Sequence, residues 1–94
     1  MKTKIEAARA LTWKTAWEAD NGIRNTQSAA HAKRFAADSS MEITTDAVQI
    51  FGGYGYSEEY PVARLMRGAK VLQIYEGSSQ IQRMIIGREM LRDL

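Results

Sequence analysis

The sequence predicts an all-α fold of four antiparallel helices, and three observations support this expectation. Small and apolar residues recur at intervals of three and four in four separate segments, which is the spacing of one face of an α-helix. Pro61 is the only proline among the 94 residues, so few positions interrupt a helix. No low-complexity run or internal repeat is visible, and helices joined by a few tight connections should therefore dominate.

The first helix is expected over residues 3–20. Leu11 belongs to an apolar face at helical spacing, while Trp13 and Trp17 mark a second stripe on another face. Two apolar stripes predict burial on two sides, with the tryptophans as packing anchors. Asn21-Gly22 follows and supplies a left-handed residue of the kind that commonly ends a helix.

The second helix is expected over residues 26–51, with a loop after it. Small residues such as Ala32 and Ala36 recur on one face and permit close packing against another helix. In residues 52–56 glycine occupies three of four successive positions, and each glycine lowers helix propensity by about 1 kcal/mol. We therefore expect a shaped loop without helix there.

Two further helices complete the prediction. One should span residues 61–72, because proline suits the first turn of a helix. Ser78 or Ser79 is a good N-cap for the last helix, which should reach about residue 92. Arg88 falls within the apolar stripe of that helix, where an unpaired guanidinium would be costly, so it should meet an anion or extend to water.

Composition indicates one small domain and excludes several classes of function. At 94 residues, only about 60 to 65% of the unfolded chain's surface can be buried, so burial against a partner would stabilise the fold. The net charge of +2 comes from scattered basic residues, which argues against a nucleic-acid surface, and no apolar run is long enough for a membrane span. Without cysteine, and with His31 as the only histidine, neither a disulfide nor a metal site is expected. The N-terminal residues do not resemble a signal or transit peptide.

The glycine cluster of Gly52, Gly53 and Gly55 has two interpretations. It resembles a phosphate-binding loop, but it follows a helical pattern and lacks the preceding strand and the Lys-Ser/Thr pair of a P-loop. It is then a helix terminator with a tight turn. Alternatively, its exposed amides and Gln49 contact a ligand at the helix end.

Glu76 stands between an aromatic residue, Tyr75, and a flexible glycine, Gly77, just before a predicted helix cap. Apolar residues precede and follow this segment. One interpretation places the carboxylate in a dry pocket, where desolvation would suit it to act as a general base. The other is a solvated loop glutamate that is stabilised by the dipole of the following helix.

Three motifs carry a resemblance to a known family. They are Ala47-Val-Gln-Ile-Phe-Gly-Gly-Tyr-Gly-Tyr56, Tyr60-Pro-Val-Ala-Arg-Leu-Met-Arg67 and Gln73-Ile-Tyr-Glu-Gly-Ser-Ser-Gln-Ile-Gln-Arg83. In this order and spacing they closely resemble the C-terminal helical domain of acyl-CoA dehydrogenases, over nearly the whole chain. Residues 1–94 are accordingly expected to be that domain, a partial four-helix bundle without the family's N-terminal helical and middle β domains.

The resemblance implies the family's activity, which is the α,β-dehydrogenation of acyl-CoA thioesters. In the family, hydride passes to FAD and electrons leave to an electron-transfer flavoprotein, and the subunits form a homo-oligomer, either a dimer or a tetramer. A bacterial cytoplasm or a mitochondrial matrix is the location that the family implies. As a segment, this chain is expected to be inactive alone, not to retain FAD and to self-associate.

The resemblance also assigns roles to residues. Glu76 matches the base that removes the α-proton, and its backbone amide matches a donor to the thioester carbonyl. Contacts to substrate are implied for Tyr75, Gly77 and Arg88. Contacts to FAD are implied for Gln49, Ile50, Phe51, Gly52, Gly53, Ser78, Ser79 and Gln80, the first five against FAD bound mainly to a neighbouring subunit. No metal ligand is implied.

Two positions depart from the family pattern, and alternatives stay open. Ser78 replaces the usual threonine but keeps the hydroxyl, and Gly68 stands where an aspartate commonly follows the arginine, which removes an expected partner of Arg67. Isovaleryl-type enzymes carry the base on an earlier helix, so Glu76 favours a straight-chain or simple branched substrate. Acyl-CoA oxidases share this fold and base. The alternative function is a non-catalytic helical oligomerisation module, derived from the family by truncation.

Overall fold

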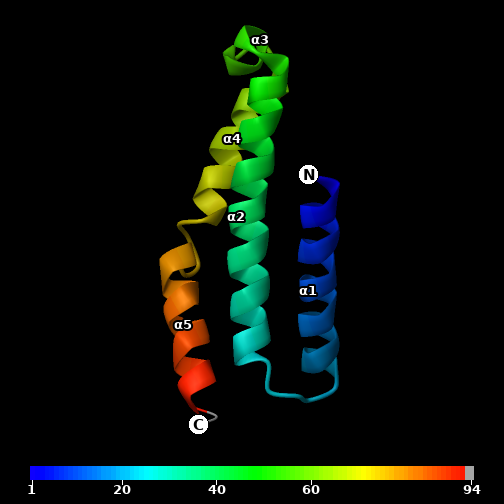
Figure 1. Ribbon diagram of the computed structural model, residues 1–94, viewed down its shortest axis with the longest axis vertical. Helices are drawn as coiled ribbons and strands as arrows, with labels where there is room; N and C mark the ends of the chain where they lie inside the picture. Colours follow the sequence, from blue (N-terminus) through cyan, green and yellow to red (C-terminus); the bar gives the residue numbers. More distant parts are fainter. Residues whose placement is uncertain (93–94) are drawn as a thin grey trace.

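The computed structural model describes residues 1–92 as helices joined by short loops, with no strand in that range (Figure 1). In chain order the helices are α1 (Lys2–Asp20), α2 (Thr26–Phe51), α3 (Gly53–Tyr56), α4 (Pro61–Leu72) and α5 (Ser79–Arg92). The all-α prediction is confirmed, and the four predicted helices are all present close to their expected bounds. No helix of the described range combines the length and the apolar character that crossing a membrane requires.

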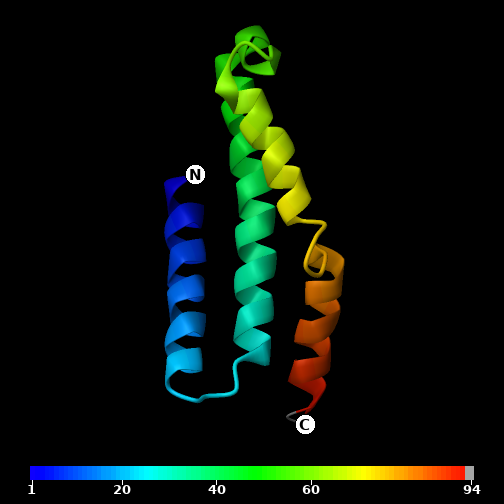
Figure 2. The ribbon, with the colours of Figure 1, turned by 180° about the vertical axis from the view of Figure 1, so that it is seen from behind.

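α2 is the central helix, and every other helix packs against it (Figure 1). α1 runs antiparallel to α2 along one side. α4 and α5 follow one another along the other side, and both run antiparallel to α2 (Figure 2). Together they occupy the place of one long helix beside α2, which explains an elongated molecule with extents of 50 × 22 × 18 Å.

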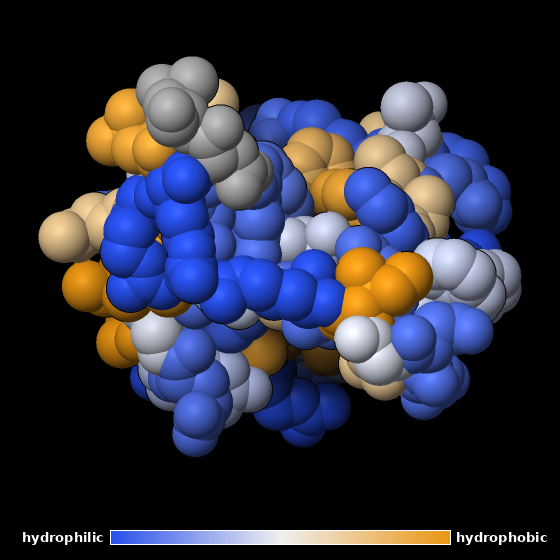
Figure 3. Space-filling view, turned by 90° about the horizontal axis from the view of Figure 1, so that it is seen from below, coloured by the Kyte–Doolittle hydropathy of each residue, from blue (hydrophilic) through white to orange (hydrophobic). Residues whose placement is uncertain are grey.

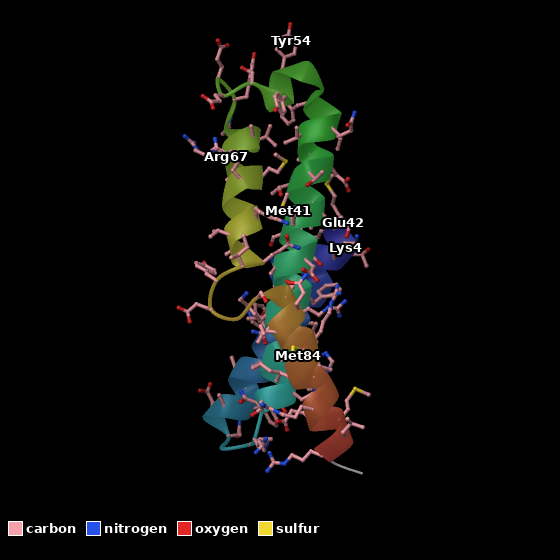
Figure 4. All side chains as sticks on the ribbon, turned by 90° about the vertical axis from the view of Figure 1, so that its left-hand side faces the viewer. Lys4, Met41, Glu42, Tyr54, Arg67 and Met84 are labelled. Carbon is pink, nitrogen blue, oxygen red and sulfur yellow. The ribbon has the colours of Figure 1, made fainter. Side chains whose placement is uncertain are left out.

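α1 packs on α2 through one face only. Leu11 on that face is half-buried, and Lys4 forms an ion pair with Glu42 of α2 (Figure 4). On another face, Trp13 is 69% exposed and Trp17 is 59% exposed. The expected burial of α1 on two sides is therefore wrong for this chain, because α1 contacts only α2 among the described helices.

The core is made of small side chains, as the alanine-rich face of α2 predicted. Because alanine side chains are short, they let α2 approach α4 and α5 closely, and little large apolar volume lies between the helices. Many large apolar side chains stay exposed, and hydrophobic residues gather in separate groups at the end of the molecule seen in Figure 3. The most deeply buried apolar residues are Ala30, Ala32, Ala37, Val62, Ala63 and Ala69.

The loop predicted for residues 52–56 contains a one-turn helix, α3, so that prediction is wrong in part. Gly52 ends α2 with a left-handed φ of 67°, and the amide of Gly55 donates to the carbonyl of Gly52 at 2.9 Å, which closes the turn. Gly55 is buried against α2, where a Cβ atom would lie 2.6 Å from the carbonyl oxygen of Val48. The turn places Tyr54 at the tip of the molecule, pointing outward (Figure 4).

The starts of α4 and α5 agree with their sequence signals. Pro61 is the first residue of α4. Ser78 precedes α5, and its hydroxyl accepts a hydrogen bond from the amide of Ile81 at 3.3 Å, which is an N-cap interaction. These two boundaries leave residues 73–78 as the connection that carries Glu76.

Arg67 has an acidic partner even though Gly68 supplies none. Its guanidinium extends away from α2 (Figure 4) and lies 3.9 Å from the carboxylate of Glu58. Both side chains are largely exposed, and surface pairs of this kind contribute about 0 to 1 kcal/mol. The pair is therefore a weak replacement for a neighbouring aspartate.

Candidate active site

The connection between α4 and α5, residues 73–78, is called the Glu76 loop below. Among the non-glycine residues of the described chain, only Glu76 has a positive φ, at 54°, and Gly77 follows it with a φ of 86°. A left-handed backbone costs an L-residue about 1 to 2 kcal/mol, so it persists only where the surrounding structure imposes it. The amide of Ser79 donates to the carbonyl of Gln73 at 3.0 Å and closes the loop.

Asp38 of α2 binds both ends of the Glu76 loop. Its Oδ1 accepts hydrogen bonds from Gln73 Nε2 at 2.9 Å and from the buried Ser79 hydroxyl at 2.7 Å, and Arg34 and Arg83 lie 3.6 and 3.8 Å from its Oδ2. Burial raises the pKa of Asp38, but the two hydrogen bonds and the two arginines together hold that pKa below its ordinary value. The carboxylate therefore stays ionised and accepts both bonds near neutral pH.

Lys33 of α2 also reaches the loop. Its Nζ donates to the carbonyl of Leu72 at 2.6 Å and to that of Gly77 at 3.4 Å, and it lies 5.9 Å from the centroid of the Tyr75 ring. The carbonyl of Gly77 accepts a second bond from Gln82 Nε2 at 3.2 Å. The backbone on both sides of Glu76 is thus held from α2 and α5.

The loop offers a carboxylate, unpaired amides and an apolar wall in one place. None of the hydrogen bonds among residues 1–92 uses the backbone amide of Glu76 or Gly77. Glu76 is exposed, so of its two interpretations the solvated loop glutamate describes residues 1–92, and the dry pocket is not formed there. An open pocket of about 350 Å³ beside it is lined by Lys33, Ala36, Ala37, Ser40, Leu72, Tyr75 and Glu76.

The glycine cluster forms a second candidate surface at the far end of α2. Residues 49–53 are all exposed there. Gly52 is required by its left-handed φ, whereas Gly53 has neither a positive φ nor any atom within 4 Å of an added Cβ. Among residues 1–92 no contact explains a glycine at position 53, and the open space around it suits a contact from outside.

Arg88 meets an anion of its own chain. Its Nη2 lies 3.3 Å from Glu89 Oε1, and its side chain is 66% exposed, so the prediction that it meets an anion or reaches water is confirmed. Glu89 is 5% exposed and accepts bonds from Arg24 Nη2 to both of its oxygens at 2.9 Å. The bonds from Arg24 hold the pKa of Glu89 below its ordinary value, although burial opposes them. This contact fastens α5 to the connection between α1 and α2.

Metal-binding geometry is absent from the part of the chain that the structure describes. No group of three or more His, Cys, Asp or Glu side chains converges there. His31 Nε2 lies 3.4 Å from Gln27 Nε2 one turn earlier on α2, so the histidine is locally bonded, as expected. The chemistry of both candidate surfaces rests on carboxylate, amide and backbone groups.

A family model for the C-terminal domain of acyl-CoA dehydrogenase matches residues 1–91. The chain belongs to the acyl-CoA dehydrogenase family. Cyclohexane-1-carbonyl-CoA dehydrogenase of Geobacter metallireducens is 56% identical to it over 91 residues, which are 97% of this chain and 24% of that relative. The chain thus spans about a quarter of the length of the curated relatives it matches.

Solved structures share the arrangement of these helices. Butyryl-CoA dehydrogenase from Megasphaera elsdenii is 59% identical with a TM-score of 0.95, and the match covers 98% of this chain and 24% of that one. A chain in a structure of the electron transferring flavoprotein of Acidaminococcus fermentans is 54% identical with a TM-score of 0.94 over the same shares. The fold of the acyl-CoA dehydrogenase C-terminal domain is therefore shown for residues 1–92.

The structure brings some of the predicted site residues together and separates others. Residues 75–80 are adjacent at the Glu76 loop and the start of α5, where all of them except the buried Ser79 are at least partly exposed. Residues 49–53 lie elsewhere, because Asp38 contacts this segment and Phe51 is 13 residues further along α2, or about 20 Å at 1.5 Å per residue. By the same measure Arg88 is about 14 Å along α5 from Ser79.

Sequence reasoning missed the residues that hold the loop. Lys33, Asp38 and Gln73 were not singled out, although Lys33 and Asp38 interrupt the small-residue face of α2, which is otherwise suited to close packing. A charged group within such a face needs a partner, and this requirement could have identified both residues. Their partners are backbone carbonyls and loop side chains, which no sequence pattern indicates.

Proposed function

We propose that this chain contributes the catalytic base, Glu76, to an FAD-dependent acyl-CoA dehydrogenase. The observation that carries the proposal is the left-handed backbone at Glu76, unique among non-glycine residues of the described range. Strained conformations of this kind gather at functional sites, because a structure without a use for the strain would relax it. The strained residue is a carboxylate at the edge of an apolar pocket, which is the group and the place that a base acting on a bound acyl chain requires.

The chemistry follows from the groups that the loop presents. The α-carbon next to a thioester carbonyl is weakly acidic, so the carboxylate of Glu76 removes an α-proton while negative charge develops on the thioester oxygen. The unpaired amide of Glu76 is available to donate to that oxygen, and one such donor contributes about 10²- to 10³-fold in comparable acyl chemistry. Gly77 has no side chain, so the thioester can approach the backbone closely. FAD, when bound, supplies the acceptor for the β-hydride.

The residues assigned to FAD fit a ligand that extends across two subunits. Ser78 precedes α5 and Gln80 lies in its first turn, where amides at a helix N-terminus suit a polar ligand. Residues 49–53 lie about 20 Å away along the direction of α2. The resemblance assigns them to FAD bound mainly by a neighbouring subunit, so one FAD molecule would contact the Glu76 loop of one subunit and the glycine cluster of the other. A contact through Ser79 stays a prediction, since its hydroxyl and amide both bond within the chain.

The proposal extends to substrate and partners. The substrate is an acyl-CoA thioester with a small acyl group, because the relatives reported above include a butyryl-CoA dehydrogenase and a cyclohexane-1-carbonyl-CoA dehydrogenase. Tyr75, Gly77 and Arg88 are proposed to contact it. Electrons leave to an electron-transfer flavoprotein, and the subunits form a dimer or tetramer that covers the exposed Trp13 and Trp17. The chain alone is expected to bind no FAD and to turn over no substrate.

A full-length chimera tests the proposal. In it this chain replaces the matching quarter of butyryl-CoA dehydrogenase from Megasphaera elsdenii, to which it is 59% identical. Glu76→Gln keeps the size of the side chain and removes the base, so acyl-CoA should still bind and perturb the flavin spectrum. Rapid mixing should show flavin bleaching slowed by about 10²- to 10⁴-fold, the contribution of a general base. Bleaching near the parental rate would place the base elsewhere.

Gln49→Ala is the matched comparison at the other surface. Gln49 is proposed to contact FAD, so its loss should weaken cofactor retention by about 0.5 to 1.5 kcal/mol, and excess FAD should restore turnover. Glu76→Gln should not recover with excess FAD. A non-catalytic oligomerisation module predicts instead that the Glu76→Gln and parental chimeras behave alike, so the same experiment decides between the two functions.

A further inference from the structure

The Glu76 loop is held by one carboxylate at positions placed evenly around Glu76. Gln73 and Ser79 lie three residues before and three residues after it, and both donate to Oδ1 of Asp38, at 2.9 and 2.7 Å. The carboxylate thereby fixes the distance between the two ends of the loop. The direct backbone bond from Ser79 to Gln73 alone would leave both side chains free to rotate.

Lys33 fixes the loop at a second pair of points. Its ammonium group donates to the carbonyls of Leu72 and Gly77, at 2.6 and 3.4 Å, which bracket Glu76 on the backbone. The second acceptor belongs to the peptide group between Gly77 and Ser78, one peptide beyond the group that follows Glu76, so this bond fixes the backbone that leads out of Glu76 toward α5. Lys33 and Asp38 both come from α2, which is the most extensively packed helix of the chain.

We propose that Asp38 and Lys33 are positioning residues for Glu76. They hold the loop so that the carboxylate and the amide of Glu76 both face the position of the acyl-CoA thioester. The inference rests on the proposed function of Glu76. Its physical basis is that a displacement of about 1 Å in a catalytic group lowers a rate by about 10²-fold, while substrate binding depends on many other contacts.

The main test uses the full-length chimera with Asp38→Ala. This change removes both loop bonds, and flavin bleaching should become about 10- to 100-fold slower, with the affinity for acyl-CoA changed less than about threefold. Asp38→Asn keeps an Oδ1 that accepts from Gln73 and Ser79, so most of the rate should return. Lys33→Met and Lys33→Arg form the corresponding pair at the second anchor. Asp46→Ala, at an exposed acidic position on the same helix, should leave the rate unchanged.

A double variant separates positioning from a general structural role. When Glu76→Gln is already present, adding Asp38→Ala should slow bleaching by less than about threefold, because two changes that act through one group are not additive. A purely structural Asp38 would impose its full loss on both backgrounds. If Asp38→Ala does not fold, Gln73→Ala takes its place in the double variant with Glu76→Gln. That change removes the bond from Gln73 to Asp38 and leaves the bond from Ser79.

Proteolysis of the full-length chimera without cofactor provides an independent readout. A glutamate-specific protease should cut after Glu76 faster when the loop is held less firmly, because cleavage requires the exposed segment to unfold locally. Asp38→Ala should be cut there at least tenfold faster than the parent, and Asp38→Asn at nearly the parental rate. Unchanged bleaching or unchanged cutting in Asp38→Ala would overturn the positioning role. Glu76→Gln distinguishes this failure from a failure of the proposed function. If Glu76→Gln slows flavin bleaching while Asp38→Ala does not, only the positioning role is wrong, and if Glu76→Gln also bleaches at the parental rate, the proposed function of Glu76 is wrong as well.

Discussion

Gly77→Ala should destabilise the fold, while Gly87→Ala should stabilise it. At Gly77 the backbone has a φ of 86°, where an alanine costs about 1 to 2 kcal/mol. An added Cβ would also lie 2.5 Å from Gln82 Nε2, so the Gln82 side chain must move and lose its 3.2 Å bond to the carbonyl of Gly77. That bond contributes about 0.5 to 1.5 kcal/mol. Alanine restricts the unfolded chain and returns about 0.4 to 1 kcal/mol, which leaves a loss of about 2 kcal/mol.

Gly87 is the matched control because it lies inside α5. Its φ is not positive, and an added Cβ would meet no atom within 4 Å. Alanine in a helix interior is more stable than glycine by about 0.5 to 1 kcal/mol. The two substitutions make the same chemical change and differ only in backbone conformation and in what surrounds the added methyl group, so their opposite signs test the loop geometry directly.

Urea denaturation followed by far-ultraviolet circular dichroism measures both changes. The midpoint should fall for Gly77→Ala and rise for Gly87→Ala, with an unchanged dependence on urea concentration, since neither change alters the buried area much. Each variant should be measured at several protein concentrations, because self-association would add to the apparent stability. A Gly77→Ala midpoint equal to or above that of the parent would refute the left-handed conformation at residue 77.

Two other predictions concern the charged groups and the strained residue. Folding lowers the pKa of Asp38 and the pKa of Glu89 from their ordinary values of 3.8 and 4.5. The two ionised carboxylates therefore stabilise the fold fully above those ordinary values, and this stabilisation is lost as the pH falls through the lower pKa values of the folded state. Acid titration by circular dichroism should therefore show unfolding below about pH 4, and Glu89→Gln should flatten that transition. Glu76→Asn should raise the free energy of unfolding by about 0.5 to 1 kcal/mol, because asparagine tolerates a positive φ better than glutamate. The urea midpoint should rise accordingly, and an unchanged midpoint would argue against strain there.

The helices could be predicted because their signals are local. Proline at position 61, a serine before α5 and the Asn21-Gly22 pair each act within one turn of the residues they affect, and the structure confirms all three boundaries. The one-turn helix α3 was not predicted, because Gly55 is selected by a tertiary contact with α2 and not by helix propensity. Helix propensity correctly predicted that α2 ends before the glycine cluster, but it did not predict that residues 53–56 form a further helical turn.

The candidate site shows a similar division. Glu76 and its neighbours were found because they form a continuous motif in the sequence. Its environment was not, because exposure depends on which other segments cover the loop. The anchors Lys33 and Asp38 precede Glu76 by 43 and 38 residues and act through backbone carbonyls and a shared carboxylate oxygen. No local pattern records such a contact, and only the packing of α2 against the start of α5 reveals it.

The number of anchors is explained by the strain that they oppose. The left-handed backbone of Glu76 costs about 1 to 2 kcal/mol. One ordinary hydrogen bond would be too weak to hold the loop in that conformation, because the backbone would relax to a negative φ. Asp38, Lys33 and Gln82 together make five bonds to the loop and its flanking residues, at about 0.5 to 1.5 kcal/mol each. The sum exceeds the strain even at its lower end. The loop therefore keeps the conformation of Glu76 without help from a ligand. Under the proposed function, substrate would meet a base and a backbone donor that are already in place.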